Sequence, residues 1–310
     1  MGGDYAPNEV VLGVIQSLPE LEGDTRLVLF GDEVAIKDLF SRENADISLV
    51  DIVHTTEVIG MDEQATRAIA GKPDSSISRG FEHLKAGKID GFASAGNSGA
   101  MMVGAMFSVK TVPGILRPAI SSVIPKEDGS WGLFLDAGAN ADCKPEHLQQ
   151  FAILGSLFLE HVYGVPNPKV GLMNIGEEEE KGNMLCQATH PLLKNTREIN
   201  FIGNIEGRDL FNDKADVIVC DGFTGNVILK LAESFYSLIK RRKIKDEYFD
   251  RFNFENYGGT PVLGVNAPVI IAHGISNARA IKNMIHITRK VTAAGLTEKI
   301  AQAVHESITQ

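Results

Sequence analysis

The chain has 310 residues, of which 44% are hydrophobic and 23% are charged. This balance is typical of a folded globular protein and excludes a disordered chain, a collagen and a coiled coil. The formal net charge is −10 at pH 7, so the surface as a whole is a poor binder of nucleic acid or anionic lipid. An anionic partner would have to be met by a local basic patch.

The cysteines and the apolar runs indicate an intracellular protein. Only three cysteines are present, which argues against a disulfide framework or a structural zinc site and fits a reducing cytoplasm. The first residues lack the pattern of a secretory leader, so we expect no secretory signal. The longest uncharged run, residues 91–109, contains glycines and polar residues. It predicts a strand, a loop and a helix rather than a membrane span.

Short apolar runs alternate with longer segments of helical period along the chain. The expected strands are residues 26–31, 91–95, 133–135, 169–174, 201–203 and 216–220. The expected helices are residues 9–17, 34–40, 75–86, 146–161, 184–193 and 227–240. This alternation predicts a mostly parallel sheet with helices on both faces.

Five of the expected strands run into glycine-rich polar turns, most of which enter a helix. The turns cover residues 96–100, 136–140, 175–183, 204–207 and 221–226. In an open parallel sheet such turns share one edge, where helix amino termini present N–H groups that suit phosphate. One such turn is a common connector, but five together indicate a ligand site. None matches the P-loop or the dinucleotide-binding pattern, so neither nucleotide nor NAD is indicated.

A series of motifs in these turns resembles the bacterial phosphate acyltransferase family (PlsX). The longest are SAGNSGA, NFIGNIEGRDL and DGFTGNVILK, at residues 94–100, 200–210 and 221–230. The other matching segments are residues 1–7, 117–119, 136–148, 174–183, 257–259 and 272–274. The resemblance covers nearly the whole chain.

The resemblance implies a three-layer α/β/α sandwich related to the isocitrate and isopropylmalate dehydrogenases, with residues 1–310 forming a single large α/β unit. It implies transfer of a long-chain fatty acyl group from acyl carrier protein to inorganic phosphate, which gives acyl phosphate for phospholipid synthesis. It also implies a cytoplasmic homodimer with peripheral contact to the inner face of the cell membrane. No cofactor and no metal are expected. Two alternatives stay open: a short-chain phosphate acyltransferase acting on acyl-CoA, and a non-catalytic acyl or carrier-protein binding module.

The chain departs from the family in two places. Family members usually carry an apolar strand before the Met-Gly-Gly-Asp motif, whereas this chain starts at that Met, so we expect the natural protein to be longer. Residues 230–257 are shorter than the helical insertion that family members carry at this place. In the family, that insertion is linked to contact with the carrier protein and the membrane.

Acyl transfer from a thioester to phosphate needs oxyanion stabilisation more than acid–base help, because phosphate is already ionised at pH 7 and a thiolate leaves readily. Backbone N–H groups and polar side chains of the glycine turns can supply it. The predicted phosphate and oxyanion residues are Gly96, Ser98, Gly99, Gly138, Asn140, Lys144, Gly222, Thr224 and Gly225. Asn97 and Asn226 are predicted catalytic donors, with helix capping as the alternative.

Lys181 is the predicted catalytic cation. Four glutamates at residues 177–180 precede it and favour its charged form. A covalent acyl-lysine stays open, and so does a solvated helix start with Lys181 on the surface. His147 is the remaining predicted catalytic residue, because it could polarise a carbonyl or orient phosphate. A helix-start histidine held by a carboxylate explains it equally, and His273 is expected to be a buried structural histidine.

Residues 240–245 form the one strong basic cluster of the sequence. It ends an expected helix with an apolar face of Ile228, Leu231, Phe235, Leu238 and Ile239. Lys240, Arg241, Arg242 and Lys243 are predicted to attract the acidic carrier protein or anionic lipid. The alternative is a helix carboxyl terminus with favourable cations.

Overall fold

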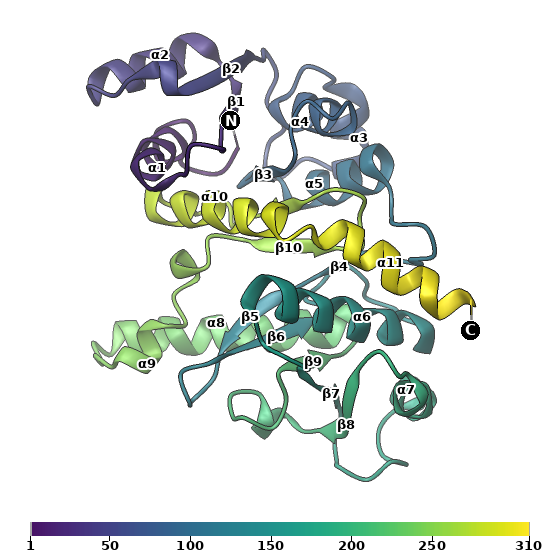
Figure 1. Cartoon of the computed structure of the whole chain (residues 1–310). Helices are drawn as coiled ribbons and strands as arrows, with labels where there is room; N and C mark the ends of the chain where they lie inside the picture. The colour runs from purple at the N-terminus through teal and green to yellow at the C-terminus, as the bar shows by residue number, and fades with distance from the viewer. Residues whose placement is uncertain (1, 310) are drawn as a thin grey trace. The chain divides into compact units, whose positions relative to one another are not determined.

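The computed structural model describes residues 2–309, so Met1 of the first motif lies outside the described residues. The chain forms two compact units (Figure 1). Unit 1 consists of Met1–Lys110, Phe254–Pro261 and Val265–Ala293, and unit 2 of Thr111–Asn253, Val262–Gly264 and Ala294–Gln310.

Unit 2 contains a five-stranded sheet and most of its covering helices. The strands of unit 2 are β4 (Ala119–Ile120), β5 (Ser122–Pro125), β6 (Trp131–Leu135), β7 (Lys169–Met173), β8 (Asn200–Ile205) and β9 (Val217–Val219). All of them except β4 belong to the five-stranded sheet. Its helices are α6 (Pro145–Phe158), η4 (Leu159–Tyr163), α7 (Met184–Asn195), η5 (Gly207–Asp209), α8 (Gly222–Arg241), α9 (Glu247–Asp250) and α11 (Leu296–Thr309).

The five strands lie in the order β5-β6-β9-β7-β8. Strands β6, β9, β7 and β8 run parallel, and only the edge strand β5 is antiparallel to its neighbour. The central strands β6 and β9 are almost wholly apolar and buried. This is expected of a parallel sheet covered on both faces.

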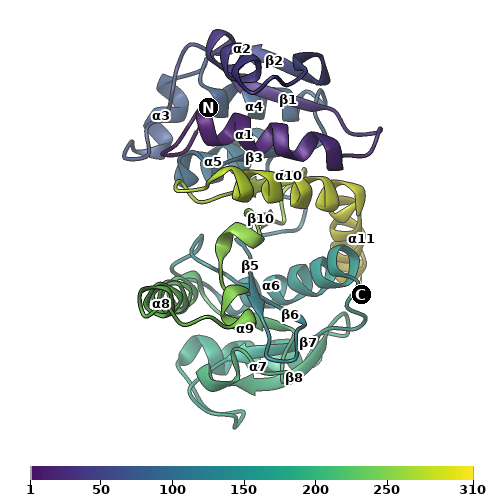
Figure 2. The same cartoon turned by 90° about the vertical axis from the view of Figure 1, so that its left-hand side faces the viewer.

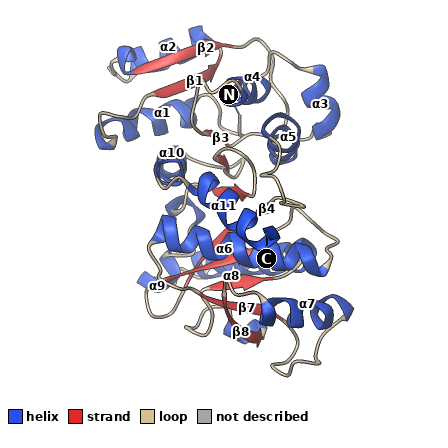
Figure 3. Ribbon diagram, turned by 45° about the vertical axis from the view of Figure 1, so that its right-hand side comes forward, coloured by secondary structure: helices blue, strands red, loops and turns tan. Residues whose placement is uncertain are grey.

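Helices cover the two faces of this sheet, and successive strand residues point to opposite faces. Gly155 of α6 brings that helix against Leu133, Leu135 and Val217. The intervening residue Phe134 belongs to the core on the other face, where α8 packs. Figure 2 shows strands between α6 and α8, and Figure 3 shows the same strands in red. Unit 2 is therefore a three-layer α/β/α arrangement.

Unit 1 is also built from strands and helices. Its strands are β1 (Leu27–Gly31), β2 (Val50–His54), β3 (Phe92–Ser94) and β11 (Val269–Ile271), and β10 (Thr260–Leu263) begins in it and ends in unit 2. Its helices are α1 (Asn8–Ser17), η1 (Leu18–Glu20), α2 (Glu33–Arg42), η2 (Ile47–Leu49), α3 (Ala65–Gly71), α4 (Ser76–Lys85), α5 (Ser98–Gly104), η3 (Ala105–Val109), η6 (Phe254–Asn256) and α10 (Ala278–Ala293).

Strands β3 and β11 are parallel neighbours in unit 1, and β10 pairs with β11 in the antiparallel sense. Strand β1 pairs in parallel with β2. Glycines set the helix packing: a Cβ at Gly80 of α4 would lie 2.2 Å from the ring of Phe92. The structure confirms the expected α/β class with parallel-rich sheets. None of the helices in the described part of the chain combines the length and the apolar composition that a bilayer span requires.

Candidate functional site

Four glycine-rich turns lie at the carboxyl edge of the sheet of unit 2. They follow β6, β7, β8 and β9, which are parallel to one another. The turns cover residues 136–140, 174–183, 206–207 and 220–225. This is the edge at which open parallel sheets bind ligands. The fifth predicted turn, residues 96–100, belongs to unit 1.

Asp136, the first residue after β6, organises its turn through a fully buried carboxylate. Its oxygens accept hydrogen bonds from the backbone N–H groups of Ile120 (3.1 Å), Ala139 (3.1 Å) and Asn140 (2.6 Å) and from Asn140 Nδ2 (2.8 Å). Asn140 Nδ2 also donates to the Pro118 carbonyl. Burial raises the pKa of Asp136, and these hydrogen bonds oppose the rise. The Asn140 amide is thus part of the scaffold, and its contact with phosphate stays a prediction.

The first turn of α8 lies directly against residues 136–140, and two glycines permit this approach. A Cβ at Gly222 would lie 2.7 Å from the carbonyl oxygen of Asn140, and one at Gly225 would lie 1.8 Å from that of Asp136. The N–H of Gly222 donates to the Asn140 carbonyl at 2.7 Å. No side chain larger than hydrogen fits at either position without moving the backbone.

Asn226 points toward the same turn and does not cap α8. The cap is Asp221, which accepts hydrogen bonds from Thr224 N and from the Thr224 hydroxyl, both at 2.8 Å. Asn226 Nδ2 donates to the Ala137 carbonyl at 3.4 Å. It also lies 2.8 Å from where a Cβ would stand on Gly138, whose φ of +127° favours glycine. The capping alternative is therefore wrong for Asn226, and its catalytic role stays a prediction.

The backbone N–H groups at this edge differ in their availability. Those of Gly222 and Gly225 donate to Asn140 and Asp221 carbonyls. Within residues 2–309, no acceptor takes up the N–H of Gly138 or of Phe223. Of the three glycines predicted at this edge, Gly138 therefore keeps an available N–H group, whereas those of Gly222 and Gly225 are already used.

His147 and Lys144 stand at the start of α6. His147 is buried, and its Nδ1 accepts a hydrogen bond from the Lys144 backbone N–H at 3.1 Å. A neutral ring therefore carries its proton on Nε2. Burial lowers the pKa of His147, and the positive charge of Arg117 lowers it further. The partner of His147 Nδ1 is thus a backbone N–H group, whereas the sequence had suggested a carboxylate as the alternative. Lys144 itself is exposed.

Lys181 lies in the turn after β7, which Asn174 closes. Asn174 Nδ2 donates to the Lys181 carbonyl at 3.1 Å, and a Cβ on Gly182 would lie 2.2 Å from Asn174 Oδ1. The Lys181 residue is exposed. Two of the glutamates before it pair with other cations, Glu177 with Lys214 at 2.7 Å and Glu179 with Lys194 at 2.6 Å. Its catalytic role stays a prediction.

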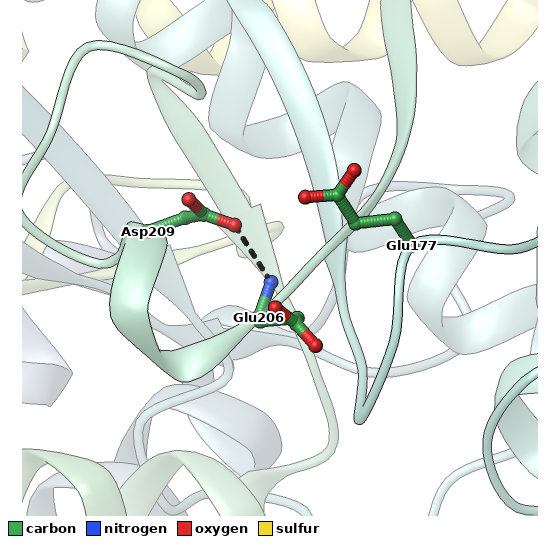
Figure 4. Close-up of side chains that lie close together, drawn as sticks. All are labelled: Glu177, Glu206 and Asp209. Carbon is green, nitrogen blue, oxygen red and sulfur yellow. Dashed lines mark hydrogen bonds between the residues drawn. The ribbon is translucent and has the colours of Figure 1, made fainter.

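Three carboxylates gather beside this turn. Oxygen atoms of Glu177, Glu206 and Asp209 lie within 4.8 Å of one another (Figure 4). Lys214 Nζ contacts both Glu177 (2.7 Å) and Asp209 (3.0 Å), and Arg208 pairs with Glu206. Hydrogen bonding to Glu177 raises the pKa of Lys214. The cations balance the acidic charge, so the cluster is an ion-pair network that fixes the turns after β7 and β8.

The predicted turn of unit 1 is held by Asn97. Asn97 Oδ1 accepts the N–H of Ala100 at 2.9 Å, which caps α5. Its amide donates to the carbonyls of Gly60 (3.0 Å), Met61 (3.2 Å) and Glu63 (3.0 Å). The capping interpretation is confirmed for Asn97. The same side chain also ties the loop of residues 60–63 to the turn, which the sequence pattern did not predict.

The other residues of this turn have different roles. The N–H of Gly96 donates to Ser94 Oγ at 3.0 Å. Ser98 and Gly99 are exposed, and their N–H groups find no acceptor in the described part of the chain. His273 is half-buried, and its ring packs edge-on against Phe254 with centroids 4.9 Å apart.

The cysteines are poorly suited to nucleophilic catalysis. Burial raises the pKa of Cys143 to about 11, and the negative charges of Asp136 and Asp221 raise it further. Burial also raises the pKa of Cys186 and of Cys220. A protonated thiol is a weak nucleophile, so burial disfavours a nucleophilic role for these thiols.

Helix α8 exposes an apolar stripe over most of its length. The exposed side chains are Phe223, Val227, Leu231, Phe235 and Leu238. Ile228, by contrast, packs on the core of unit 2. The single apolar face that the sequence predicted for this helix therefore consists of a buried part and an exposed part. The helix ends at Arg241, and residues 240–245 are exposed. Lys240 Nζ lies 5.0 Å from the centre of the Tyr236 ring.

The fold and the turns define an α/β protein with uncommitted backbone N–H groups at the carboxyl edges of parallel strands, and solved structures share this fold. The chain resembles a EutD phosphotransacetylase from Staphylococcus aureus, with a TM-score of 0.59 at 17% identity over 91% of this chain and 98% of that one. It also resembles a branched-chain phosphotransacylase from Enterococcus faecalis V583, with a TM-score of 0.62 at 12% identity over 94% and 96%. A 4-hydroxythreonine-4-phosphate dehydrogenase from Klebsiella pneumoniae gives 0.56 at 10% identity over 92% and 95%.

Sequence relatives are much closer. A family model described as "Fatty acid synthesis protein" matches residues 1–299. A phosphate acyltransferase from Dictyoglomus turgidum is 42% identical over 99% of this chain and 96% of its own length. Another, from Desulforamulus reducens, is 43% identical over 98% and 95%. The chain belongs to this family of phosphate acyltransferases.

Proposed function

We propose that the protein transfers a long-chain fatty acyl group from acyl carrier protein to inorganic phosphate, and that phospholipid synthesis consumes the acyl phosphate. The observation that carries this proposal is the family match over nearly the full length of both chains. The contact between the first turn of α8 and residues 136–140 supports it, because it places backbone donors at a ligand-binding edge.

In this reaction a phosphate oxygen attacks the thioester carbonyl carbon. A C–O bond forms, the tetrahedral oxyanion collapses, and the C–S bond breaks to release the carrier thiolate, which then takes a proton from water. The chain must hold a dianion and stabilise the developing oxyanion. The uncommitted N–H groups of Gly138 and Phe223 are suited to the first task.

The cationic residues have proposed roles in the same chemistry. Lys181 and Lys144 are exposed ammonium groups on the turns at the edge of the unit 2 sheet. A cation there would stabilise the phosphate and the charge that builds up in the transition state. His147 would orient the substrate through its Nε2–H, because its Nδ1 is already occupied by the Lys144 backbone.

The surface of α8 is the proposed contact region for macromolecules. An exposed apolar stripe of this length is unusual on a monomer, and we assign it to packing against a second copy of the chain. Analytical ultracentrifugation would measure whether the chain is a dimer in solution. The adjoining basic residues, Lys240, Arg241, Arg242 and Lys243, are the proposed carrier-protein contact. A peripheral contact with anionic membranes would use the same cations.

Hydroxylamine trapping tests the proposed function, because hydroxylamine converts an acyl phosphate into a stable hydroxamate. The purified protein is incubated with phosphate and either hexadecanoyl carrier protein or acetyl-CoA. Phosphate-dependent hexadecanoyl hydroxamate is the expected product. Acetyl hydroxamate alone would favour the short-chain acyltransferase, and the absence of phosphate-dependent thioester loss with both donors would favour a binding module.

A further inference from the structure

Three exposed apolar residues of unit 1 belong to chain segments that meet at Gly274. Tyr5, Met61 and Ile275, the Gly274 patch, are 53%, 43% and 53% exposed. Tyr5 follows Asp4, whose N–H donates to the Gly274 carbonyl at 2.7 Å. Met61 Cε lies 2.6 Å from where a Cβ would stand on Gly274. Three separate segments of the chain therefore meet at Gly274, and each carries an exposed apolar residue at or next to the meeting point.

The patch is attached to the predicted oxyanion turn. The Asn97 amide donates to the carbonyl of Met61 itself and to those of Gly60 and Glu63. Glu63 reinforces this loop by accepting the Gly60 N–H at 2.6 Å and by pairing with Lys72. Met61 is thus presented by a loop with a fixed backbone.

The patch also lies at the ligand-binding edge of a parallel pair of strands. Ile271 of β11 pairs with Ser94 of β3, so the turns that follow both strands leave the same edge. One of these turns carries the exposed N–H groups of Ser98 and Gly99, and the other carries Gly274. Polar donors beside an apolar surface match an acyl thioester, in which a carbonyl group precedes a hydrocarbon chain.

We propose that the Gly274 patch contacts the acyl chain and that Met61 and Ile275 set its preferred length. This inference rests on the proposed function and adds to it the residues that distinguish long from short acyl groups. Each methylene that leaves water adds to the binding affinity, so a long chain gains affinity from the patch and a chain of four carbons gains little.

The test compares Met61→Glu and Ile275→Glu with the wild-type full-length chain. Val34→Glu is the matched control, because Val34 is 67% exposed in α2 of the same unit. Calorimetry measures the dissociation constants of dodecyl phosphonate and butyl phosphonate, which are stable analogues of acyl phosphates. The value of kcat/KM is measured with dodecanoyl and butanoyl carrier protein.

Both patch variants are expected to weaken dodecyl phosphonate binding at least tenfold and to change butyl phosphonate binding less than twofold. The control is expected to change neither. Equal losses for the two chain lengths, or no loss, would overturn the assignment. Lack of turnover by the wild-type protein would contradict the proposed function, and the ratio of phosphonate affinities would still decide whether the patch binds the chain.

Discussion

Asp136 shows what single residues contribute to the candidate site. The sequence places an aspartate and a glycine turn after a buried strand, and this pattern predicts a turn at the sheet edge. It does not predict that the carboxylate is fully buried or that Ile120 donates to it. Ile120 belongs to a two-residue strand, β4, which is too short for a pattern to identify.

Asp136→Asn is expected to destabilise the chain. The amide keeps one oxygen, but its nitrogen would face donors, so at least one buried N–H group loses its acceptor. Each such loss costs about 1–3 kcal/mol, and we expect the free energy of unfolding in denaturant to fall by about 2 kcal/mol. Asp142→Asn, at an exposed position of the same turn region, is the control. Equal stability of the two variants would contradict the role of Asp136 as the anchor of its turn.

His147 makes the stability of the chain depend on pH. Burial and the charge of Arg117 lower its pKa in the folded state below the unfolded value of about 6.5. As the pH falls below that value, the unfolded chain takes up a proton before the folded chain does, so stability is lost. Wild-type stability should therefore fall between pH 7 and pH 5 more steeply than that of His147→Asn. Parallel profiles in denaturant unfolding would argue that the folded environment does not disfavour the charged ring.

Lys181→Ala is expected to reduce turnover at least tenfold, which corresponds to about 1.4 kcal/mol of barrier. The physical reason is the loss of a positive charge near the developing oxyanion. Lys194→Ala removes another lysine from the same region and is the control, because Lys194 pairs with Glu179. Unchanged turnover in steady-state assays of Lys181→Ala would remove this residue from the mechanism.

Helices and strands could be predicted where the spacing of the apolar residues and the length of the segment both indicated the same type of element. The sequence indicates α6 and its continuation η4 because apolar positions recur over residues 146–161. It indicates β7 because residues 170–173, within the expected strand 169–174, carry no polar side chain. Helix α8 begins at Gly222, five residues before the expected start. The apolar period begins only at Val227, although the cap residue Asp221 marks the true beginning. Strand β10 is short and contains Pro261, which hides it from a pattern search.

The carboxyl end of α8 supports a prediction about association. Reversing the charge with Arg241→Glu and Arg242→Glu is expected to raise the apparent KM for acyl carrier protein more at low salt than at high salt. At 0.1 M ionic strength, salt screens the interaction between exposed charges that are more than about 10 Å apart. An effect of electrostatic steering on KM must therefore become smaller as salt is added. Lys85→Glu with Lys88→Glu changes the net charge equally at another exposed site. An equal effect at both salt concentrations would contradict steering.

At the scale of the whole molecule, the predicted site residues belong to two units. Residues 96–99 are in unit 1, and Asn140, Lys181 and Asn226 are in unit 2. The sequence shows which turn follows which strand, because that relation is local. It does not show which unit a strand joins, since residues 265–293 return to the unit formed by the first part of the chain. Such pairings depend on contacts between distant segments, for which a single sequence carries no periodic signal.

The central claim is that phosphate itself attacks the acyl thioester. Its most direct test is a phosphate titration at fixed hexadecanoyl carrier protein, in which free carrier thiol is measured with a chromogenic disulfide and acyl phosphate by ³¹P NMR. The account predicts that thiol release requires phosphate and that one acyl phosphate forms for each thiol. Thiol release that is independent of phosphate, or that is accompanied by free fatty acid in place of acyl phosphate, would contradict it.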